Sequence, residues 1–65
     1  MAILKEIPMF VKLTPNTQVS RNLRNFHITV KQGEKVILVN NNDGSKAEAI
    51  VLEPDNNNVI FIIRS

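Results

Sequence analysis

The feature that most constrains the fold is a run of five consecutive apolar residues at positions 59–63. Alternate side chains of a strand point to opposite faces, so this run is apolar on both, with Ile60 and Ile62 on the second face. Residues 36–39 (VILV) share the property. In a sheet with one solvent-exposed face, the strands alternate apolar and polar residues instead. The sequence therefore predicts that another part of this chain, or another chain, covers the second face.

Turn-forming residues separate the apolar runs. Residues 40–44 (NNNDG) end in Asp-Gly, a strong hairpin signal, and Gly44 adopts positive φ without steric cost. Residues 54–58 (PDNNN) form a second turn, because Asn and Asp bond their own backbone. We therefore expect residues 46–52 to run antiparallel between the two apolar strands.

Residues 46–53 (KAEAIVLE) also fit a second structure. Ser45 followed by Glu48 matches a capping box, and good helix formers follow before Pro54. A short helix is therefore the alternative to the strand, although the branched side chains in the segment favour pairing.

The first half of the chain is less regular. Residues 9–13 (MFVKL) suit a first or edge strand, and the polar, basic residues 19–25 suit an exposed loop or irregular strand. Residues 26–30 (FHITV) alternate cleanly, which predicts a half-buried strand with Phe26 in the core. A turn at residues 31–34 then leads into the next strand.

These elements predict an all-β fold: a five-stranded antiparallel meander closing into an SH3-like or sandwich-like barrel. We place it in one small domain, residues 9–65. The preceding residues 1–8 are expected to form an N-terminal arm, folded over its own barrel end or packed on a neighbouring subunit.

Residues 26–43 (FHITVKQGEKVILVNNND) resemble the strand–turn–strand of cupredoxin domains and other β-sandwiches, with the pattern I-x-V-x-x-G-E-x-V-x-x-V-N-N. The resemblance implies β-sandwich-like local structure. Cupredoxins bind copper through one Cys, two His and a weak axial ligand, whereas this chain has no Cys and one His. The resemblance therefore implies no copper site.

Size and composition bound the function. A domain of 65 residues buries a small core, and with no Cys it has no disulfide to reinforce it, so oligomerisation is a plausible source of stability. Residues 1–35 carry six Lys or Arg and two Glu, a net charge of +4, whereas residues 36–65 carry −2. No apolar run predicts a secretory signal or a membrane span. We expect a cytoplasmic protein, or a virion component.

Catalytic and metal-binding motifs are weak. The single histidine, His27, alternates with apolar residues and is expected to be an exposed strand residue. Neither Ser20 nor Ser45 lies in a nucleophile-elbow glycine pattern. The acidic residues Asp43 and Asp55 are explained by turn chemistry. We therefore expect a protein that is not an enzyme and uses no metal or cofactor.

The first functional hypothesis is a self-associating structural or accessory module that works through protein–protein contacts, of the kind found in viral particles or assemblies. Small size, an apolar amino-terminal segment and doubly apolar strands support it. The expected interface residues are Met1, Ile3, Leu4, Ile7, Met9, Phe10, Ile60 and Ile62.

The alternative hypothesis is a small nucleic-acid-binding barrel with a basic face. Such barrels contact phosphates through Lys and Arg and stack bases on exposed aromatics. Placing Phe26 and Phe61 in the core leaves few aromatics for stacking, so this hypothesis depends on dispersed charges. The expected contacts are Lys12, Arg21, Arg24, Lys31 and Lys35.

Overall fold

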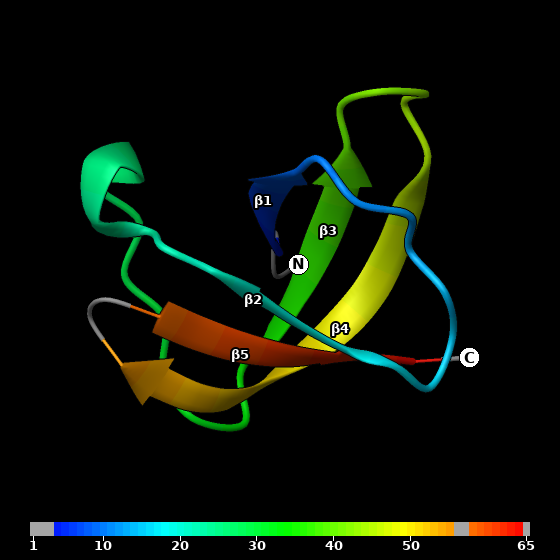
Figure 1. The fold of residues 1–65 in the computed structure, drawn as a ribbon. Helices are drawn as coiled ribbons and strands as arrows, with labels where there is room; N and C mark the ends of the chain where they lie inside the picture. Colours follow the sequence, from blue (N-terminus) through cyan, green and yellow to red (C-terminus); the bar gives the residue numbers. More distant parts are fainter. Residues whose placement is uncertain (1–3, 56–57, 65) are drawn as a thin grey trace.

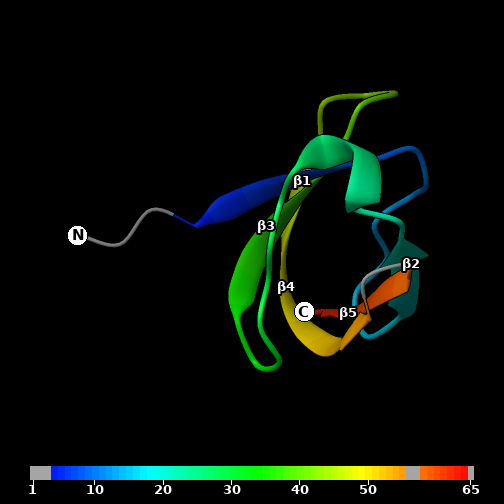
Figure 2. The same ribbon diagram turned by 90° about the vertical axis from the view of Figure 1, so that its left-hand side faces the viewer.

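The computed structural model describes residues 4–55 and 58–64 of the chain. Its elements, in chain order, are β1 (Lys5–Met9), β2 (Gln18–Arg21), a single 3₁₀ turn η1 (Arg24–Phe26), β3 (Lys35–Asn40), β4 (Lys46–Asp55) and β5 (Asn58–Ile63). The five strands form one sheet that curls into a half-barrel (Figures 1 and 2). The all-β, five-stranded prediction is confirmed.

Strand order differs from a simple meander. The sheet runs β1-β3-β4-β5-β2, and β1 pairs with β3 in parallel. The meander prediction holds for β3–β4–β5, whose neighbours are antiparallel. Parallel neighbours need a crossover of about a dozen residues or more. Residues 10–34 provide that length, so β1 lies beside β3 while β2 pairs with β5.

Residues 46–53 form a strand, so the helical alternative is wrong. The turn at 40–44 explains why: Gly44 N donates to Asn40 O at 2.7 Å and Asn40 N donates to Ser45 O at 2.8 Å. Gly44 has φ +78°, as the Asp-Gly signal predicts. This hairpin commits the chain to pair with β3, and β4 continues to Asp55 with a bulge between Val51 and Glu53.

Two predicted strands in the first half are misplaced. The first strand is Lys5–Met9 rather than 9–13, with Pro8 inside it. Residues 26–30 form no strand: Phe26 ends η1, and His27 follows with φ 56°. A left-handed residue breaks the extended path, so the alternation that began at Phe26 does not continue. In the segment that resembles a cupredoxin strand–turn–strand, the turn at 31–34 and the second strand are present, whereas the first strand is not.

The concave face of the sheet holds the core. Phe61, Leu38, Val36 and Val51 are fully buried there, and Leu23 and Val30 from the segment between β2 and β3 also belong to the core. Ile7 and Met9 of β1 are 0% and 2% exposed. β1 therefore crosses the expected boundary at residue 8, and its apolar side chains pack in the same domain.

The convex face carries the second set of apolar side chains. β3 and β5 alternate buried and half-buried residues, as the doubly apolar runs predict. An ion pair between Glu6 and Lys46 at 3.5 Å joins β1 to β4 across β3, where Ile37 and Val39 are their cross-strand neighbours. The half-buried convex residues are Ile37, Val39, Ile50, Leu52, Ile60 and Ile62.

Candidate functional site

The three phenylalanines occupy contrasting positions. Phe61 is 0% exposed in the core, as predicted, whereas Phe10 is 55% and Phe26 is 38% exposed. Within residues 4–55 and 58–64, Phe10, Phe26 and Val11 are the large apolar side chains that solvent reaches most. The prediction that Phe26 is a core residue is wrong, because Phe26 lies in the 3₁₀ turn η1 rather than in a strand of the sheet.

Arg21 lies close to both exposed rings. Its guanidinium carbon is 5.0 Å from the centroid of the Phe10 ring and 5.0 Å from that of Phe26. Both distances are within the range of cation–π attraction. We call Phe10, Arg21 and Phe26 the aromatic clamp. It joins the end of β1 to the end of β2, the two edge strands of the half-barrel.

Local backbone contacts hold the clamp in place. Met9 O accepts from Asn41 N at 2.9 Å, and Phe10 O accepts from the Asn42 side-chain amide at 3.2 Å. On the other side, Phe26 N donates to Leu23 O at 3.1 Å within η1, and Leu23 is buried. The β3–β4 turn and a core leucine therefore position both rings.

One polar atom of the clamp has no partner. Arg21 Nε is buried and makes no hydrogen bond within the described part of the chain. A buried donor without an acceptor costs about 1–3 kcal/mol. The guanidinium carries further N–H donors besides Nε, so the cation beside the two rings can bind acceptor oxygens. The clamp is therefore suited to a ligand with planar rings and acceptor oxygens.

The sequence around the clamp is uniformly basic. Residues 7–33 contain four Lys or Arg and no Asp or Glu. Lys12 and Arg24 are exposed and lie two residues from Phe10 and Phe26 respectively. Glu34 pairs with Lys5 and Glu6 pairs with Lys46, so these two carboxylates engage cations that lie outside residues 7–33. The segment that carries the clamp is therefore positively charged in itself.

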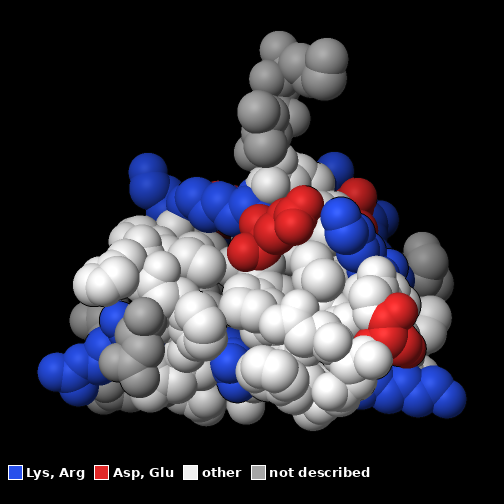
Figure 3. Space-filling view, turned by 90° about the horizontal axis from the view of Figure 1, so that it is seen from above, with Lys and Arg blue, Asp and Glu red and all other residues white. Residues whose placement is uncertain are grey.

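The other predicted nucleic-acid contacts lie elsewhere. Lys35 is on the convex face opposite Ile50, whereas Arg21 is on the concave side of β2 opposite Val59. Lys31 belongs to the turn before β3. The structure therefore brings Arg21 together with two rings but does not gather all five cations on one face. Seen from above, charged groups are scattered around a largely uncharged surface (Figure 3).

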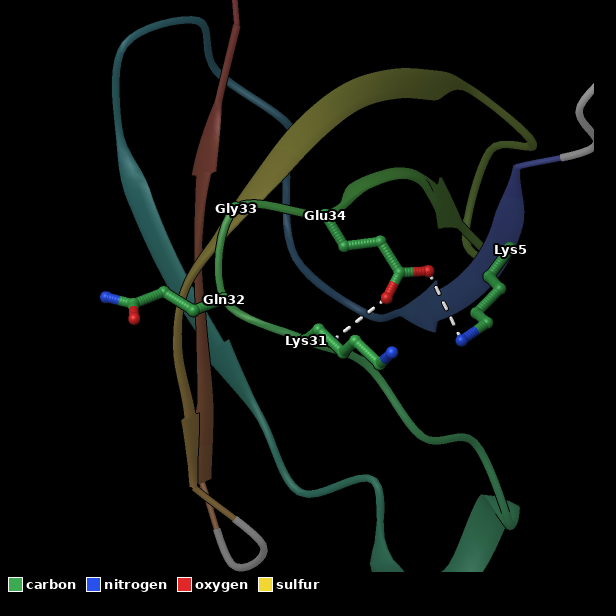
Figure 4. A pocket seen from close by; sticks show the side chains of 5 residues that line it. All are labelled: Lys5, Lys31, Gln32, Gly33 and Glu34. Carbon is green, nitrogen blue, oxygen red and sulfur yellow. Dashed lines mark hydrogen bonds and ion pairs between the residues drawn. The ribbon is translucent and has the colours of Figure 1, made fainter.

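A cavity beside that turn has a structural explanation. Lys5, Lys31, Gln32, Gly33 and Glu34 line it (Figure 4). Glu34 accepts from Lys31 N at 2.9 Å and pairs with Lys5 Nζ at 3.2 Å. The Lys31 backbone donor, followed by the Lys5 side chain, lowers the pKa of Glu34 from its ordinary value. This carboxylate ties β1 to the turn, so its contacts explain the site without a ligand.

A second concave region adjoins η1. It is an open groove of about 620 Å³ between the segment 23–30 and the facing ends of β4 and β5. Its lining combines buried apolar residues with exposed polar ones. The lining residues are Leu23, Arg24, His27, Ile28, Thr29, Val30, Pro54, Asp55 and Val59.

The predicted protein-interface residues separate into three groups. Ile7 and Met9 are core residues and are unavailable to a partner in this conformation, which corrects their assignment. Leu4, Ile60 and Ile62 are half-buried and Phe10 is exposed. Met1 and Ile3 lie outside the described residues. Burial of β1 in its own sheet explains the first group, since Lys5–Met9 forms an edge strand of that sheet.

No group of three His, Cys, Asp or Glu that could hold a metal ion occurs within residues 4–55 and 58–64. Over the same residues, no helix has the length and apolarity needed to cross a bilayer. A scan against protein-family models, a search of curated proteins and a search of solved structures each found no match. The function is therefore inferred from the geometry of the chain itself.

Proposed function

We propose that this protein is a small binding domain for single-stranded nucleic acid, with the aromatic clamp as its contact surface. The observation that carries the proposal is an arginine within cation–π distance of two solvent-exposed phenylalanine rings. Bases stack on aromatic faces at about 1–3 kcal/mol each, with little sequence preference. Phe10 and Phe26 remain exposed beside Arg21, so each can receive a base.

Electrostatics supports the same ligand. The segment that carries the clamp has no acidic residue from position 7 to 33, and its exposed cations Lys12 and Arg24 lie two residues from the rings. A nucleic-acid backbone supplies the phosphates that such cations bind, and its oxygens are acceptors for the guanidinium N–H groups. An apolar protein ligand would use the rings but leave Lys12 and Arg24 without a role.

Fluorescence anisotropy with labelled oligothymidine and oligouridine tests the proposal. Phe10→Leu and Phe26→Leu remove the stacking face but keep an apolar side chain, and each is expected to weaken binding about tenfold. The logarithm of affinity should fall against log salt with a slope of about −0.7 per phosphate contacted. Lys46→Gln, on the convex face, is the matched control and should bind normally. Absent or salt-independent binding would overturn the proposal.

Self-association as a structural module is the second candidate, and the half-buried convex face favours it. Ile50 and Ile62 are cross-strand neighbours there, with Ile60 beside them. The free edge of β1 is a poor contact, because Met9 O points toward β3 and Pro8 therefore faces outward without an N–H. Association would therefore use the convex face.

Light-scattering mass during gel filtration tests this second candidate. Ile60→Thr with Ile62→Thr keeps β-branched side chains but removes apolar surface, so an oligomer should dissociate. Val11→Thr, on an exposed apolar residue outside the sheet, is the control and should leave the oligomer intact. A full-length protein that is monomeric at every concentration would rule out this candidate.

A further inference from the structure

The two edges of the half-barrel differ in their protection. β1 forms one edge and β2 forms the other, and within the described residues no strand lies beside β2 on the side away from β5 (Figure 1). At the edge of β1, the outward position Pro8 has no N–H to donate. β2 (QVSR) contains no proline, and its residues Gln18 and Ser20 are exposed. The edge of β2 is therefore the one that can accept another strand.

The register of β2 against β5 shows which backbone groups face outward. Ile63 N donates to Thr17 O at 2.9 Å, so this carbonyl points toward β5. Backbone groups alternate in direction along a strand, so the N–H and C=O of Gln18 and Ser20 point away from β5. Outside the strand ladders, these groups make no backbone hydrogen bond within residues 4–55 and 58–64. Both residues can therefore donate to and accept from a further strand.

A second copy of β2 fits this edge in an antiparallel register that uses both residues. When Gln18 of each copy faces Ser20 of the other, a two-fold axis passes between the two Val19 residues, and each facing pair exchanges both backbone hydrogen bonds. Val19 is half-buried, and its β-branched side chain then packs against Val19 of the second copy. Arg21 faces Thr17 of the second copy, so no like charges lie directly opposite each other.

We propose that two copies of this protein pair through the edges of β2, antiparallel and in this register. The contact joins two half-barrel sheets into one continuous sheet whose concave faces lie on the same side, because residues directly opposite each other share a face. This edge is separate from the convex face, and the pairing does not depend on nucleic-acid binding. Because β2 spans four residues, the contact is small and the dimer should dissociate on dilution.

Sedimentation equilibrium of the full-length protein over a concentration series tests the pairing. Ser20→Pro removes the outward N–H but no donor to β5, so the dimer should be lost while circular dichroism keeps its β spectrum. Thr17→Lys puts like charges opposite Arg21 and should weaken the dimer about fivefold, whereas Thr17→Glu should strengthen it about fivefold. Both variants lose the same side chain, so opposite effects report charge. Thr14→Lys and Thr14→Glu, at an exposed position in the β1–β2 loop, are the matched controls and should dimerise normally.

Amide hydrogen exchange gives an independent readout. Protection of the Gln18 and Ser20 amides should rise with protein concentration more than that of Val19, whose N–H points to β5. A dimer lost with Ile60→Thr and Ile62→Thr, but unaffected by the β2 variants, would place the contact on the convex face and overturn the pairing. A monomer at every concentration, for Thr17→Glu as well as the unaltered protein, would also overturn it. Oligonucleotide binding by such a monomer would leave the clamp intact.

Discussion

The two halves of the chain fold by different means. From β3 to β5, consecutive strands are joined by tight turns and pair with their neighbours in sequence. In residues 4–34, β1 and β2 pair with strands far along the chain, and the connections between them are irregular. We call β3 to β5 the local half, because these strands pair with their neighbours in sequence, and residues 4–34 the non-local half. The local half forms the regular middle of the sheet, whereas the non-local half forms its two edge strands and covers its concave face.

The difference also separates stability from recognition. Phe61, in the local half, is fully buried, whereas Phe10 and Phe26, in the non-local half, are exposed around Arg21. A strand in the middle of a sheet has both faces and both edges committed to packing. Irregular segments after an edge strand are less committed, so they can present side chains to a ligand.

The largest expected effect compares these phenylalanines directly. Phe61→Ala should destabilise the fold by about 3–5 kcal/mol, because it leaves a cavity in a small hydrophobic core. A domain of this size has a total stability of roughly 3–10 kcal/mol, so the variant should be largely unfolded. Phe10→Ala should cost less than about 1 kcal/mol. Urea denaturation followed by circular dichroism measures both, and equal costs would contradict the division between the halves.

Arg21→Met should separate binding from stability within the clamp. The variant loses cation–π attraction, about 0.5–1 kcal/mol per exposed contact, but also loses the unpartnered Nε. Unfolding free energy should therefore change by less than about 1 kcal/mol, while oligonucleotide affinity falls about tenfold. Arg21→Lys keeps the charge without the planar fork and should bind with intermediate affinity. A large loss of stability would assign Arg21 a structural role instead.

The Glu34 anchor, which ties β1 to the turn before β3, predicts a pH dependence. Its pKa is lowered in the folded state, first by the Lys31 N–H and then by Lys5. The stabilisation is therefore present above the unfolded value of 4.5 and is lost as pH falls through the lower folded value. Glu34→Gln should reduce the dependence of the melting temperature on pH below about 4.5. Asp43, whose pKa the Ser45 backbone N–H lowers, contributes in the same direction and should leave a residual slope.

The smallest expected effect concerns the exposed ion pair between the halves. The side chains of Lys46 and Glu6 are 58% and 59% exposed, and their charged atoms are 3.5 Å apart. Exposed pairs contribute about 0–1 kcal/mol. A double-mutant cycle with Glu6→Gln and Lys46→Gln should give a coupling energy in the lower part of that range, reduced further by salt. A larger coupling would show that the pair also organises the convex face.

Prediction from sequence succeeded where turns and apolar runs agree. The Asp-Gly signal before β4 and the doubly apolar run of β5 locate the hairpins correctly. It failed where a regular pattern is interrupted by backbone conformation. Residues 26–30 alternate like a strand, but Phe26 belongs to the 3₁₀ turn η1 and the left-handed His27 follows it, so no strand forms there. Arg21 was identified by its charge alone, and no local pattern indicated the rings beside it.

The amino-acid sequence by itself determines the all-β class, the β3–β4–β5 hairpins and the burial of Phe61, because side-chain alternation and turn chemistry act over a few residues. Tertiary structure decided that β1 pairs in parallel with β3, that Ile7 and Met9 are core residues, and that Phe10 and Phe26 meet at Arg21. These contacts join residues distant in sequence, and many chain paths are compatible with the same local patterns. Packing of the whole core selects one of those paths.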